Sequence, residues 1–206
     1  TQLPNGGFVY HPNQQGFNDI QDFFNNPDIH AIWAARGGYG SNLLLNRLKK
    51  LEVNEPKIVI GSSDVSYLLW MLLDRFNMVV FYGPMAYSSI AEGRFDPASL
   101  KAVLSGEGEG MKLPGKILSS GKVSGILTGG CLTNLVSLLG TAHFPIIKDR
   151  VLLLEDVNER PYRLDRMLWQ LSQIRAFSKI KGLLLGQFPG CFKDPGEKSH
   201  FLERVE

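Results

Sequence analysis

A short polar stretch, Gly61-Ser62-Ser63-Asp64, separates two apolar segments of this sequence. The aliphatic run Lys57 to Ile60 precedes it, and an apolar segment at helical spacing follows from Val65. A serine between the end of a strand and the first turn of a helix exposes its hydroxyl, and the unpaired helix N–H groups nearby stabilise negative charge. Ser63 is therefore a candidate nucleophile. The alternative is that one of these side chains simply caps the helix, which is the commoner role of Ser and Asp.

A glycine cluster follows an earlier aliphatic run in the same way. Arg36-Gly37-Gly38-Tyr39-Gly40-Ser41 comes directly after His30 to Ala35. Paired glycines let the backbone approach a ligand and aim N–H groups at an anion or an oxyanion. A simple tight turn is the alternative. No Gly-Lys-Ser/Thr follows and Gly-x-Gly-x-x-Gly does not fit, so neither a phosphate loop nor a dinucleotide site is favoured.

A third candidate is an acidic residue after consecutive leucines, Glu155 in Leu152-Leu153-Leu154-Glu155-Asp156. A carboxylate at the end of a buried strand is costly to desolvate unless something pairs with it. Glu155 can orient a histidine, as the acid of a catalytic triad does. Equally, it can be structural, bonded to an arginine of the segment that follows. The three candidates for that role are Arg160, Arg163 and Arg166.

The thiol of Cys131 is a rival nucleophile. It lies in Thr128-Gly129-Gly130-Cys131-Leu132-Thr133, where a helix N-terminus would lower the thiol pKa. A small buried core residue is the commoner role, so Cys131 ranks below Ser63. The only other cysteine is Cys191, and neither belongs to a Cys/His cluster with metal-site spacing. No metal site is predicted, and two cysteines fit a reducing compartment.

The elements that must position these residues follow from hydrophobic periodicity. Six short aliphatic runs, bounded by Gly, Pro or Asp, predict buried strands. They are His30 to Ala35, Lys57 to Ile60, Met78 to Tyr82, Val123 to Leu127, Val151 to Leu154 and Gly182 to Leu185. Between them, helical spacing predicts helices over Asp19 to Asn25, Ser41 to Leu51, Val65 to Phe76 and Leu164 to Ile174. This alternation predicts an α/β fold with parallel sheets, helices on both faces of the N-terminal one, and candidate residues at the carboxyl ends of strands.

Composition divides the chain. Glycines gather in residues 91–121, where large apolar side chains are few, and this predicts a linker or surface excursion. The predicted organisation is an N-terminal nucleophile-bearing domain over residues 1–90, the linker over 91–121, and a smaller C-terminal α/β domain over 122–206. Lys and Arg total 22 against 20 for Asp and Glu, so no field favours nucleic acid or an anionic membrane. No apolar run approaches the roughly 20 residues that span a bilayer.

Taken together, the motifs resemble those of a known family. They are Ala35-Arg36-Gly37-Gly38-Tyr39-Gly40, Gly61-Ser62-Ser63-Asp64, Tyr82-Gly83-Pro84, Gly129-Gly130-Cys131-Leu132 and the stretch Leu154-Glu155-Asp156-Val157-Asn158-Glu159-Arg160-Pro161-Tyr162-Arg163-Leu164-Asp165-Arg166-Met167-Leu168. In order and spacing this series resembles the LD-carboxypeptidases, serine peptidases of the muramoyl-tetrapeptide carboxypeptidase type. Their relatives include the microcin C immunity peptidases. The resemblance covers nearly the whole chain.

The resemblance implies roles for these residues. Ser63 would be the nucleophile, and Glu155 the acid that orients a histidine. The backbone N–H groups of Gly38 and Asp64 would form the oxyanion hole. The active site would lie at the junction of two α/β domains.

The family's reaction also comes with the resemblance. Family members release the terminal D-alanine of a murein tetrapeptide by cleaving an L,D bond during cytoplasmic cell-wall recycling, without metal or organic cofactor. The substrate ends in a carboxylate, for which Arg36 is a partner, and Tyr39 is a second candidate for substrate binding. A homodimer and a cytoplasmic location are further expectations from the family, and neither nucleic acid nor a membrane is expected as a partner.

The histidine departs from the family pattern. In the family it comes from a Gly-His segment well beyond the Glu-Asp motif, and none of His11, His30, His143 and His200 has a matching context. His200 is expected in the first turn of an exposed helix. The opening strand and helix of the family are also lacking, so we expect a fragment of a longer polypeptide that hydrolyses little or nothing alone.

Two alternatives remain. An immunity-type peptidase that cleaves a peptidyl-nucleotide toxin would need aromatic rings able to stack on a base. Trp33 and Trp169 are candidates, but both are predicted in strand or helix cores, which disfavours this function. The other alternative is a non-catalytic module that binds murein peptides without the histidine.

Overall fold

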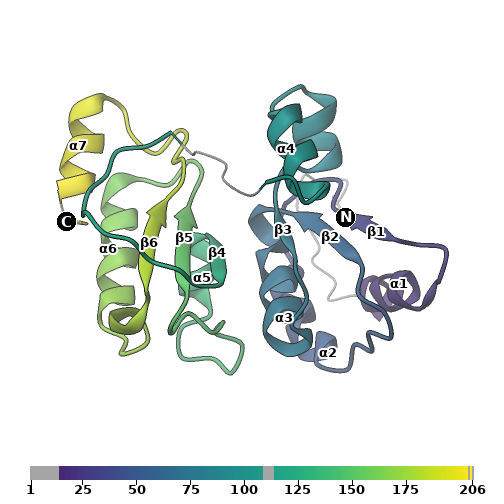
Figure 1. Ribbon diagram of the computed structural model, residues 1–206. Helices are drawn as coiled ribbons and strands as arrows, with labels where there is room; N and C mark the ends of the chain where they lie inside the picture. The colour runs from purple at the N-terminus through teal and green to yellow at the C-terminus, as the bar shows by residue number, and fades with distance from the viewer. Residues whose placement is uncertain (1–13, 109–113, 204, 206) are drawn as a thin grey trace, which may run out of the picture. The chain divides into compact units, whose positions relative to one another are not determined.

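The computed structural model describes residues 14–108, 114–203 and 205 of the 206-residue chain (Figure 1). The chain divides into two compact units. The first unit comprises Thr1–Glu92 and Gly140–Pro145, and the second comprises Gly93–Leu139 and Ile146–Glu206. The domain limits 1–90, 91–121 and 122–206 stay predictions. His11 lies outside the described residues.

The first unit is built on a parallel sheet with the strand order β1-β2-β3. The strands are β1 (Ala31–Trp33), β2 (Ile58–Gly61) and β3 (Phe81–Tyr82). Its helices are α1 (Gln14–Asn25), α2 (Ser41–Leu48), a 3-10 turn (Ser63–Val65), α3 (Ser66–Phe76) and a π-helix (Ala86–Ala91). Because all three strands run the same way, the turns that follow β1 and β2 share one edge of the sheet.

The core of the first unit forms between these helices and the sheet. Phe24 of α1, Val59 of β2, and Leu69 and Leu72 of α3 belong to one buried apolar cluster. Burying each such side chain contributes about 1.5–3 kcal/mol. The apolar stripe of α3 therefore anchors the helix that begins just after Ser63.

The second unit repeats this plan with the strand order β4-β5-β6, again parallel. The strands are β4 (Leu127–Cys131), β5 (Val151–Glu155) and β6 (Gly182–Leu185). Its helices are α4 (Pro97–Leu104), α5 (Leu132–Ser137), α6 (Pro161–Ser172), a 3-10 turn (Phe177–Lys179) and α7 (Pro195–Glu203). Fully buried leucines come from α5, β5 and α6; they are Leu132, Leu135, Leu152, Leu154, Leu164 and Leu171.

Parallel strands alternating with helices confirm the α/β class predicted from periodicity (Figure 1). The prediction for Gly182 to Leu185 matches β6 residue for residue. The prediction for Val123 to Leu127 was wrong, because β4 runs from Leu127 to Cys131. Residues 123–126 are exposed and outside the strand. The Gly-Gly pair signals a turn in sequence, whereas in the structure it lies inside the strand and pairs with β5.

The stretch predicted as a linker over residues 91–121 contains a helix, α4. The Asp96 side chain accepts hydrogen bonds from Ala98 N at 3.0 Å and Ser99 N at 3.3 Å, and Pro97 occupies the first helical position. An aspartate cap followed by proline is a strong helix start. The composition of residues 91–121 indicated a linker because glycines are frequent after this short helix.

Gly129 provides a test of the second sheet. Its φ is +124°, and a Cβ added there would run into the backbone of Leu153 on β5. We expect Gly129→Ala to destabilise the protein by ~3 kcal/mol or more, because neither backbone can move without breaking the strand pairing. Urea unfolding of the intact natural polypeptide measures this loss.

Gly121→Ala is the matched control, since nothing lies within 4 Å of the added Cβ at Gly121. It should change the free energy of unfolding by no more than about 0.5 kcal/mol. Equal stability of the two variants would show that β4 and β5 do not approach as described.

Candidate active site

Ser63 lies on a strained turn at the carboxyl end of β2. Its φ is +54°, in the left-handed region that few residues other than glycine adopt. Such a conformation costs of order 1–3 kcal/mol and persists only where the surroundings enforce it. The chain turns sharply here from strand to helix, the geometry that exposes a nucleophilic serine at the edge of an α/β sheet.

Three hydrogen bonds hold this turn. The Ser63 backbone N–H donates to the Tyr82 hydroxyl oxygen at 3.0 Å, and Tyr82 belongs to the neighbouring strand β3. The Ser66 hydroxyl donates to the Ser63 carbonyl at 2.5 Å. The Val65 N–H donates to the Ser62 carbonyl at 3.1 Å. The strained backbone of Ser63 is therefore bound on both its amide and its carbonyl side.

The glycine loop after β1 approaches the Ser63 side chain. A Cβ added at Gly37 would lie 3.1 Å from the Ser63 Cβ and 3.2 Å from its Oγ. Any side chain at position 37 would crowd the hydroxyl. Gly37 and Ser63 therefore lie close together in the turns that follow the neighbouring strands β1 and β2. Gly38, next in the loop, has a φ of +152°.

Asp64 links the two turns. It is only 8% exposed, and its Oδ2 accepts hydrogen bonds from the Ser41 N–H at 3.0 Å and the Ser41 hydroxyl at 2.7 Å. Ser41 is the first residue of α2. Asp64 therefore caps the helix that follows β1. The expectation that Ser62, Ser63 or Asp64 caps the helix after β2 was wrong, because neither the 3-10 turn nor α3 has a side-chain cap bond.

The residues expected to bind substrate lie in the same loop. Arg36 and Tyr39 are both exposed. Trp33, at the end of β1, donates its indole N–H to the Pro84 carbonyl at 2.7 Å. The prediction that Trp33 and Trp169 lie in cores was wrong: they are 36% and 62% exposed. Trp169 occupies the polar face of an amphipathic helix, where its ring meets solvent.

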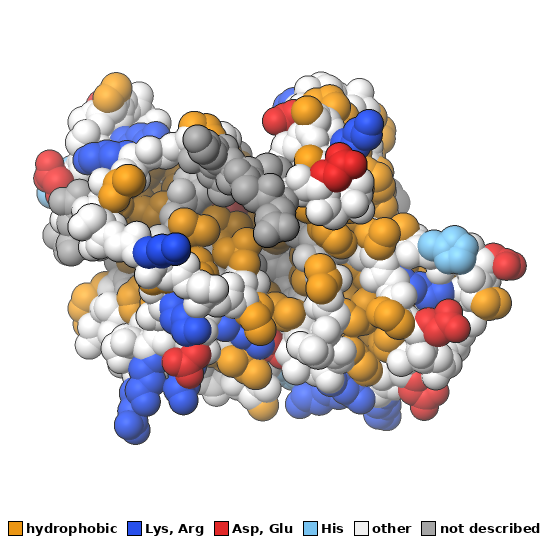
Figure 2. Space-filling view, in the orientation of Figure 1, with side chains coloured by type: hydrophobic (Ala, Val, Ile, Leu, Met, Phe, Trp, Pro, Cys, Tyr) orange, Lys and Arg blue, Asp and Glu red, His pale blue; other side chains and the backbone are white. Residues whose placement is uncertain are grey.

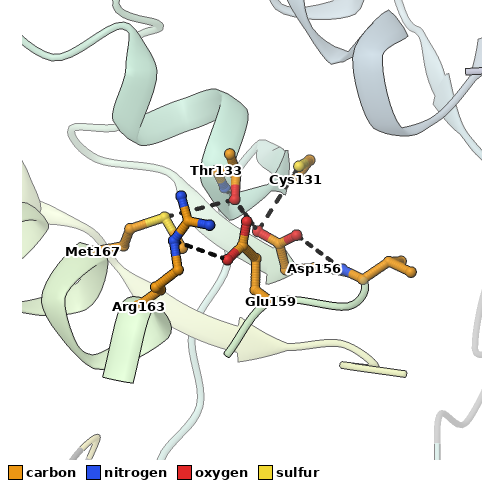
Figure 3. A network of polar contacts seen from close by, with 7 residues as sticks. Cys131, Thr133, Asp156, Glu159, Arg163 and Met167 are labelled. Atoms are coloured by element: carbon orange, nitrogen blue, oxygen red, sulfur yellow. Dashed lines mark hydrogen bonds and ion pairs between the residues drawn. The ribbon is translucent and has the colours of Figure 1, made fainter. Parts of the chain in front are cut away.

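In the second unit, two acidic residues lie at the carboxyl end of the central strand β5, as Asp64 does after β2 in the first unit. Glu155 ends β5 and is half-buried, directly opposite Cys131 in the strand register. Asp156 follows and is 4% exposed; its Oδ2 accepts from the Thr133 N–H at 2.8 Å and the Thr133 hydroxyl at 2.7 Å (Figure 3). Its Oδ1 accepts from the Val157 N–H at 2.8 Å. Thr133 lies in the first turn of α5, so Asp156 caps α5 as Asp64 caps α2.

Cys131 lies beside this carboxylate. Its Sγ is 4.0 Å from the Asp156 Oδ2 (Figure 3). Burial, and then the negative charge of Asp156, raise the pKa of the Cys131 thiol to about 12. The prediction that the thiol precedes a helix is confirmed, but the expected lowering of its pKa was wrong, because burial outweighs the helix N-terminus. Cys131 is thus a protonated core residue at neutral pH.

Two of the three arginines named as candidate partners of Glu155 make contacts within α6 or just before it. The Arg163 Nε lies 3.3 Å from the Glu159 carboxylate, four residues earlier in the sequence; the Arg163 side chain is exposed, whereas that of Glu159 is largely buried (Figure 3). The Arg166 guanidinium lies 5.5 Å from the centre of the Tyr162 ring. These contacts stabilise the start of α6.

The three histidines in the described part of the chain belong to different segments: His30 precedes β1, His143 follows α5 and His200 lies in α7. His30 precedes β1 and is exposed. His143 has its Nε2 3.0 Å from the Asn46 Oδ1, and its pKa is lowered by burial and then by Lys49. His200 lies in the last turn of α7, 3.8 Å from Glu203, so its expected place in a first turn was wrong.

Among the described residues, no group of three or more His, Cys, Asp or Glu side chains is placed to share a metal ion. None of the helices described is long and apolar enough to cross a membrane. Basic and acidic side chains are both present on the face shown in Figure 2.

Comparison with known protein families matches both halves of the chain. The model described as LD-carboxypeptidase N-terminal domain matches residues 3–83, and the LD-carboxypeptidase C-terminal domain matches residues 124–206. The chain belongs to the LD-carboxypeptidase family. Ser63 falls within the first match and Glu155 within the second.

Individual relatives agree with this assignment. The chain is 35% identical to the murein tetrapeptide carboxypeptidase of Pseudomonas aeruginosa, over 93% of the chain and 66% of that protein. It is 29% identical to the microcin C7 self-immunity protein of Escherichia coli, over 84% of the chain and 59% of that protein. The crystal structure of muramoyltetrapeptide carboxypeptidase from Oxalobacter formigenes superposes with a TM-score of 0.73 at 29% identity, covering 92% of the chain and 68% of that structure.

The chain spans 65% and 66% of the length of the two curated relatives that it matches at 33% and 35% identity. The two candidate nucleophiles both lie at the end of a β-strand, since Cys131 is the last residue of β4 and Ser63 comes two residues after β2, but their surroundings differ. The Ser63 hydroxyl lies beside the exposed glycine loop, whereas the Cys131 thiol is 8% exposed behind Asp156.

The raised pKa of Cys131 predicts an unreactive thiol. At pH 8 the folded protein should hold Cys131 protonated, so iodoacetamide should label it only after unfolding. Because the pKa is higher in the folded state than the ordinary value of 9.0, stability should be unaffected below pH 9 and fall as pH rises from 9 toward 12. Mass spectrometry of alkylated peptides and urea midpoints at each pH measure both effects.

Cys131→Ala is the control, since it removes this titration and should flatten that part of the stability profile. Cys191 has a pKa raised chiefly by burial and should be slow to alkylate too. Rapid labelling of native Cys131 at pH 8 would contradict the buried, protonated thiol.

Proposed function

We propose that the protein is a serine-type LD-carboxypeptidase that releases the terminal D-alanine from murein tetrapeptides in cell-wall recycling. The observation that carries the proposal is Ser63, held in a left-handed conformation at the carboxyl end of β2 with the Gly37 loop against its side chain. Membership of the LD-carboxypeptidase family supplies the reaction class.

In the first step, the Ser63 Oγ attacks the carbonyl carbon of the bond that joins D-alanine to the peptide. A carbon–oxygen bond forms, the carbonyl electron pair moves to oxygen, and the hydroxyl proton passes to a histidine base. We assign that base to none of the four histidines in this sequence. Glu155 accepts a hydrogen bond from the histidine and stabilises its positive charge.

The oxyanion needs hydrogen-bond donors that are in place beforehand. We assign this role to the backbone N–H groups of Gly38 and Asp64. The side chain of Asp64 supports the assignment, since its bonds to Ser41 hold the backbone of both turns. The φ of +152° at Gly38 supports it too, since L side chains rarely adopt that conformation.

Collapse of the oxyanion breaks the carbon–nitrogen bond, and the histidine returns its proton to the leaving amine of D-alanine. Water then attacks the ester on Ser63 with the same histidine as base, which releases the tripeptide and restores the hydroxyl. Arg36 binds the terminal carboxylate of the substrate and Tyr39 contacts the peptide, both from the exposed loop after β1. We further propose a cytoplasmic location and a homodimer.

Ser63→Ala tests the nucleophile in the intact natural polypeptide. We expect D-alanine release to fall by at least about 10³-fold, because no other hydroxyl replaces the attacking oxygen. Chromatography of a synthetic murein tetrapeptide and its tripeptide product measures the rate. Ser63→Gly should be equally inactive and tolerate the φ of +54° better, which separates lost chemistry from lost folding.

Ser62→Ala is the matched control, since it removes the neighbouring hydroxyl and should leave the rate within about threefold of the parent. Turnover by Ser63→Gly at the parent rate would refute the serine mechanism.

Tyr82 is a positioning residue in this proposal, because its hydroxyl accepts the Ser63 N–H. Tyr82→Phe removes an acceptor worth about 1 kcal/mol and leaves the strained turn less well held. We expect kcat to fall about 10-fold with KM unchanged, since peptide binding does not use this bond. Steady-state kinetics on the tetrapeptide measure both constants.

Tyr87→Phe is the control, because the Tyr87 side chain is exposed and its backbone N–H, which the substitution keeps, donates to the Ala35 carbonyl. A rise in KM at constant kcat for Tyr82→Phe would instead place Tyr82 in substrate binding.

The exposed rings of Trp33 and Trp169 favour a second candidate, an immunity-type peptidase that cleaves a peptidyl-nucleotide. Stacking on a base requires accessible aromatic faces. An aminoacyl sulfamoyl adenosine in the same assay distinguishes the two substrates. Binding of the tetrapeptide without turnover would favour the non-catalytic module.

A further inference from the structure

A row of three residues crosses the carboxyl end of the second sheet. Cys131 on β4 lies opposite Glu155 on β5 in the strand register. Gly186 directly follows β6, and its N–H donates to the Leu154 carbonyl at 2.8 Å, which continues the pairing of β5 with β6. Residues opposite each other on neighbouring strands share one face of the sheet. Glu155 therefore has Cys131 on one side and Gly186 on the other.

The backbone conformation does not explain the glycine at position 186. Its φ lies outside the left-handed region, whereas Gly129, Gly130 and Gly190 in the same unit have φ values from +71° to +136°. The conformational freedom of glycine is thus not what position 186 uses. A Cβ added there would lie 3.1 Å from the Glu155 Cβ, which would be its nearest neighbour. The missing side chain therefore leaves room for Glu155.

The backbone around Glu155 leaves little room for adjustment. The Leu154 carbonyl is bound to the Gly186 N–H, and the Asn158 N–H donates to the Pro189 carbonyl at 2.9 Å. Carbon atoms pack best about 3.5–4.0 Å apart, so an alanine at position 186 would push the Glu155 side chain away by a few tenths of an ångström. With the backbone bound on both sides, we expect the carboxylate to turn.

Cys131, the other neighbour in the row, is small and uncharged. Burial, and then the negative charge of Asp156, raise the pKa of its thiol to about 12. The Asp156 carboxylate itself accepts the hydrogen bonds of Thr133 (Figure 3). Neither neighbour in the row therefore competes, as a cation would, with a histidine for the Glu155 carboxylate.

We propose that Gly186 is a positioning residue, which leaves the Glu155 side chain the space to hold its carboxylate at the angle that orients the histidine base. The inference rests on the proposed function, in which Glu155 accepts a hydrogen bond from that histidine. Gly186 acts only through Glu155. The first unit has a parallel, since Gly37 after β1 leaves room for Ser63 in the same way.

Gly186→Ala tests the inference in the intact natural polypeptide. We expect kcat for D-alanine release to fall about 10-fold with KM unchanged, because small misplacements of a catalytic group are costly and peptide binding does not use position 186. The acid limb of the kcat/KM profile should move to lower pH by about half a unit, because a displaced carboxylate stabilises the protonated histidine less. Steady-state kinetics across the pH range measure both effects.

Gly182→Ala is the matched control on the same strand and the same face of the sheet. A Cβ added at Gly182 would lie 3.2 Å from a Val123 methyl carbon, so the crowding is similar. Position 182 is about 13 Å along the strand from position 186, at the opposite end of the sheet from Glu155. The control should change the urea midpoint about as much as Gly186→Ala and leave kcat and the acid limb unchanged.

A double-mutant cycle shows whether Gly186 acts through Glu155. Glu155→Gln removes the charge but keeps the Cβ, so the crowding from an alanine at position 186 remains. In that background Gly186→Ala should lower kcat by no more than about threefold, since the carboxylate that it displaces is already gone. A 10-fold loss in both backgrounds would overturn the inference, because Gly186 would then act independently of Glu155.

Two further results overturn the inference. One is a Gly186→Ala enzyme that keeps the kcat and the acid limb of the parent. The other is a Gly186→Ala chain that does not fold while Gly182→Ala does, because the glycine then serves the sheet. The assay uses whichever of the tetrapeptide and the aminoacyl sulfamoyl adenosine the wild type cleaves. A wild type that cleaves neither refutes the proposed function and this inference with it, whereas the other outcomes leave the Ser63 mechanism standing.

Discussion

Asp64 and Asp156 make the same interaction in the two units of the chain. Each follows a central strand, is almost fully buried, and accepts both the N–H and the hydroxyl of a residue at the start of the helix that follows the neighbouring strand. A buried carboxylate is tolerated only with such charge-assisted hydrogen bonds. The helix N-terminus adds favourable partial charge. Each aspartate therefore ties two turns together at the edge of its sheet.

The residue before each aspartate is the one to which we assign chemistry, Ser63 in the first unit and Glu155 in the second. Anchoring the aspartate inward leaves little freedom for the preceding backbone. In the first unit this constraint coincides with the left-handed conformation of Ser63, which Tyr82 and Ser66 also hold. A rigid support of this kind gives an attacking oxygen one position relative to its donors.

The fold class followed from local patterns. Gly182 to Leu185 is a short apolar run bounded by glycine, and that local pattern predicts a buried strand. The errors came where tertiary contacts outweigh local preference. β4 includes two glycines because its backbone lies against β5, and α4 depends on a single aspartate cap within a glycine-rich stretch.

The sequence by itself determined the α/β class, the family resemblance and the turns that carry Ser63, Gly38 and Glu155. Each depends on short-range patterns that the chain carries locally. Only the tertiary structure decided that Asp64 caps α2 across 23 residues, and that Cys131 is held protonated. Hydrogen-bond partners and burial depend on contacts between residues that are distant in the sequence, and the spacing of neighbouring residues does not predict those contacts.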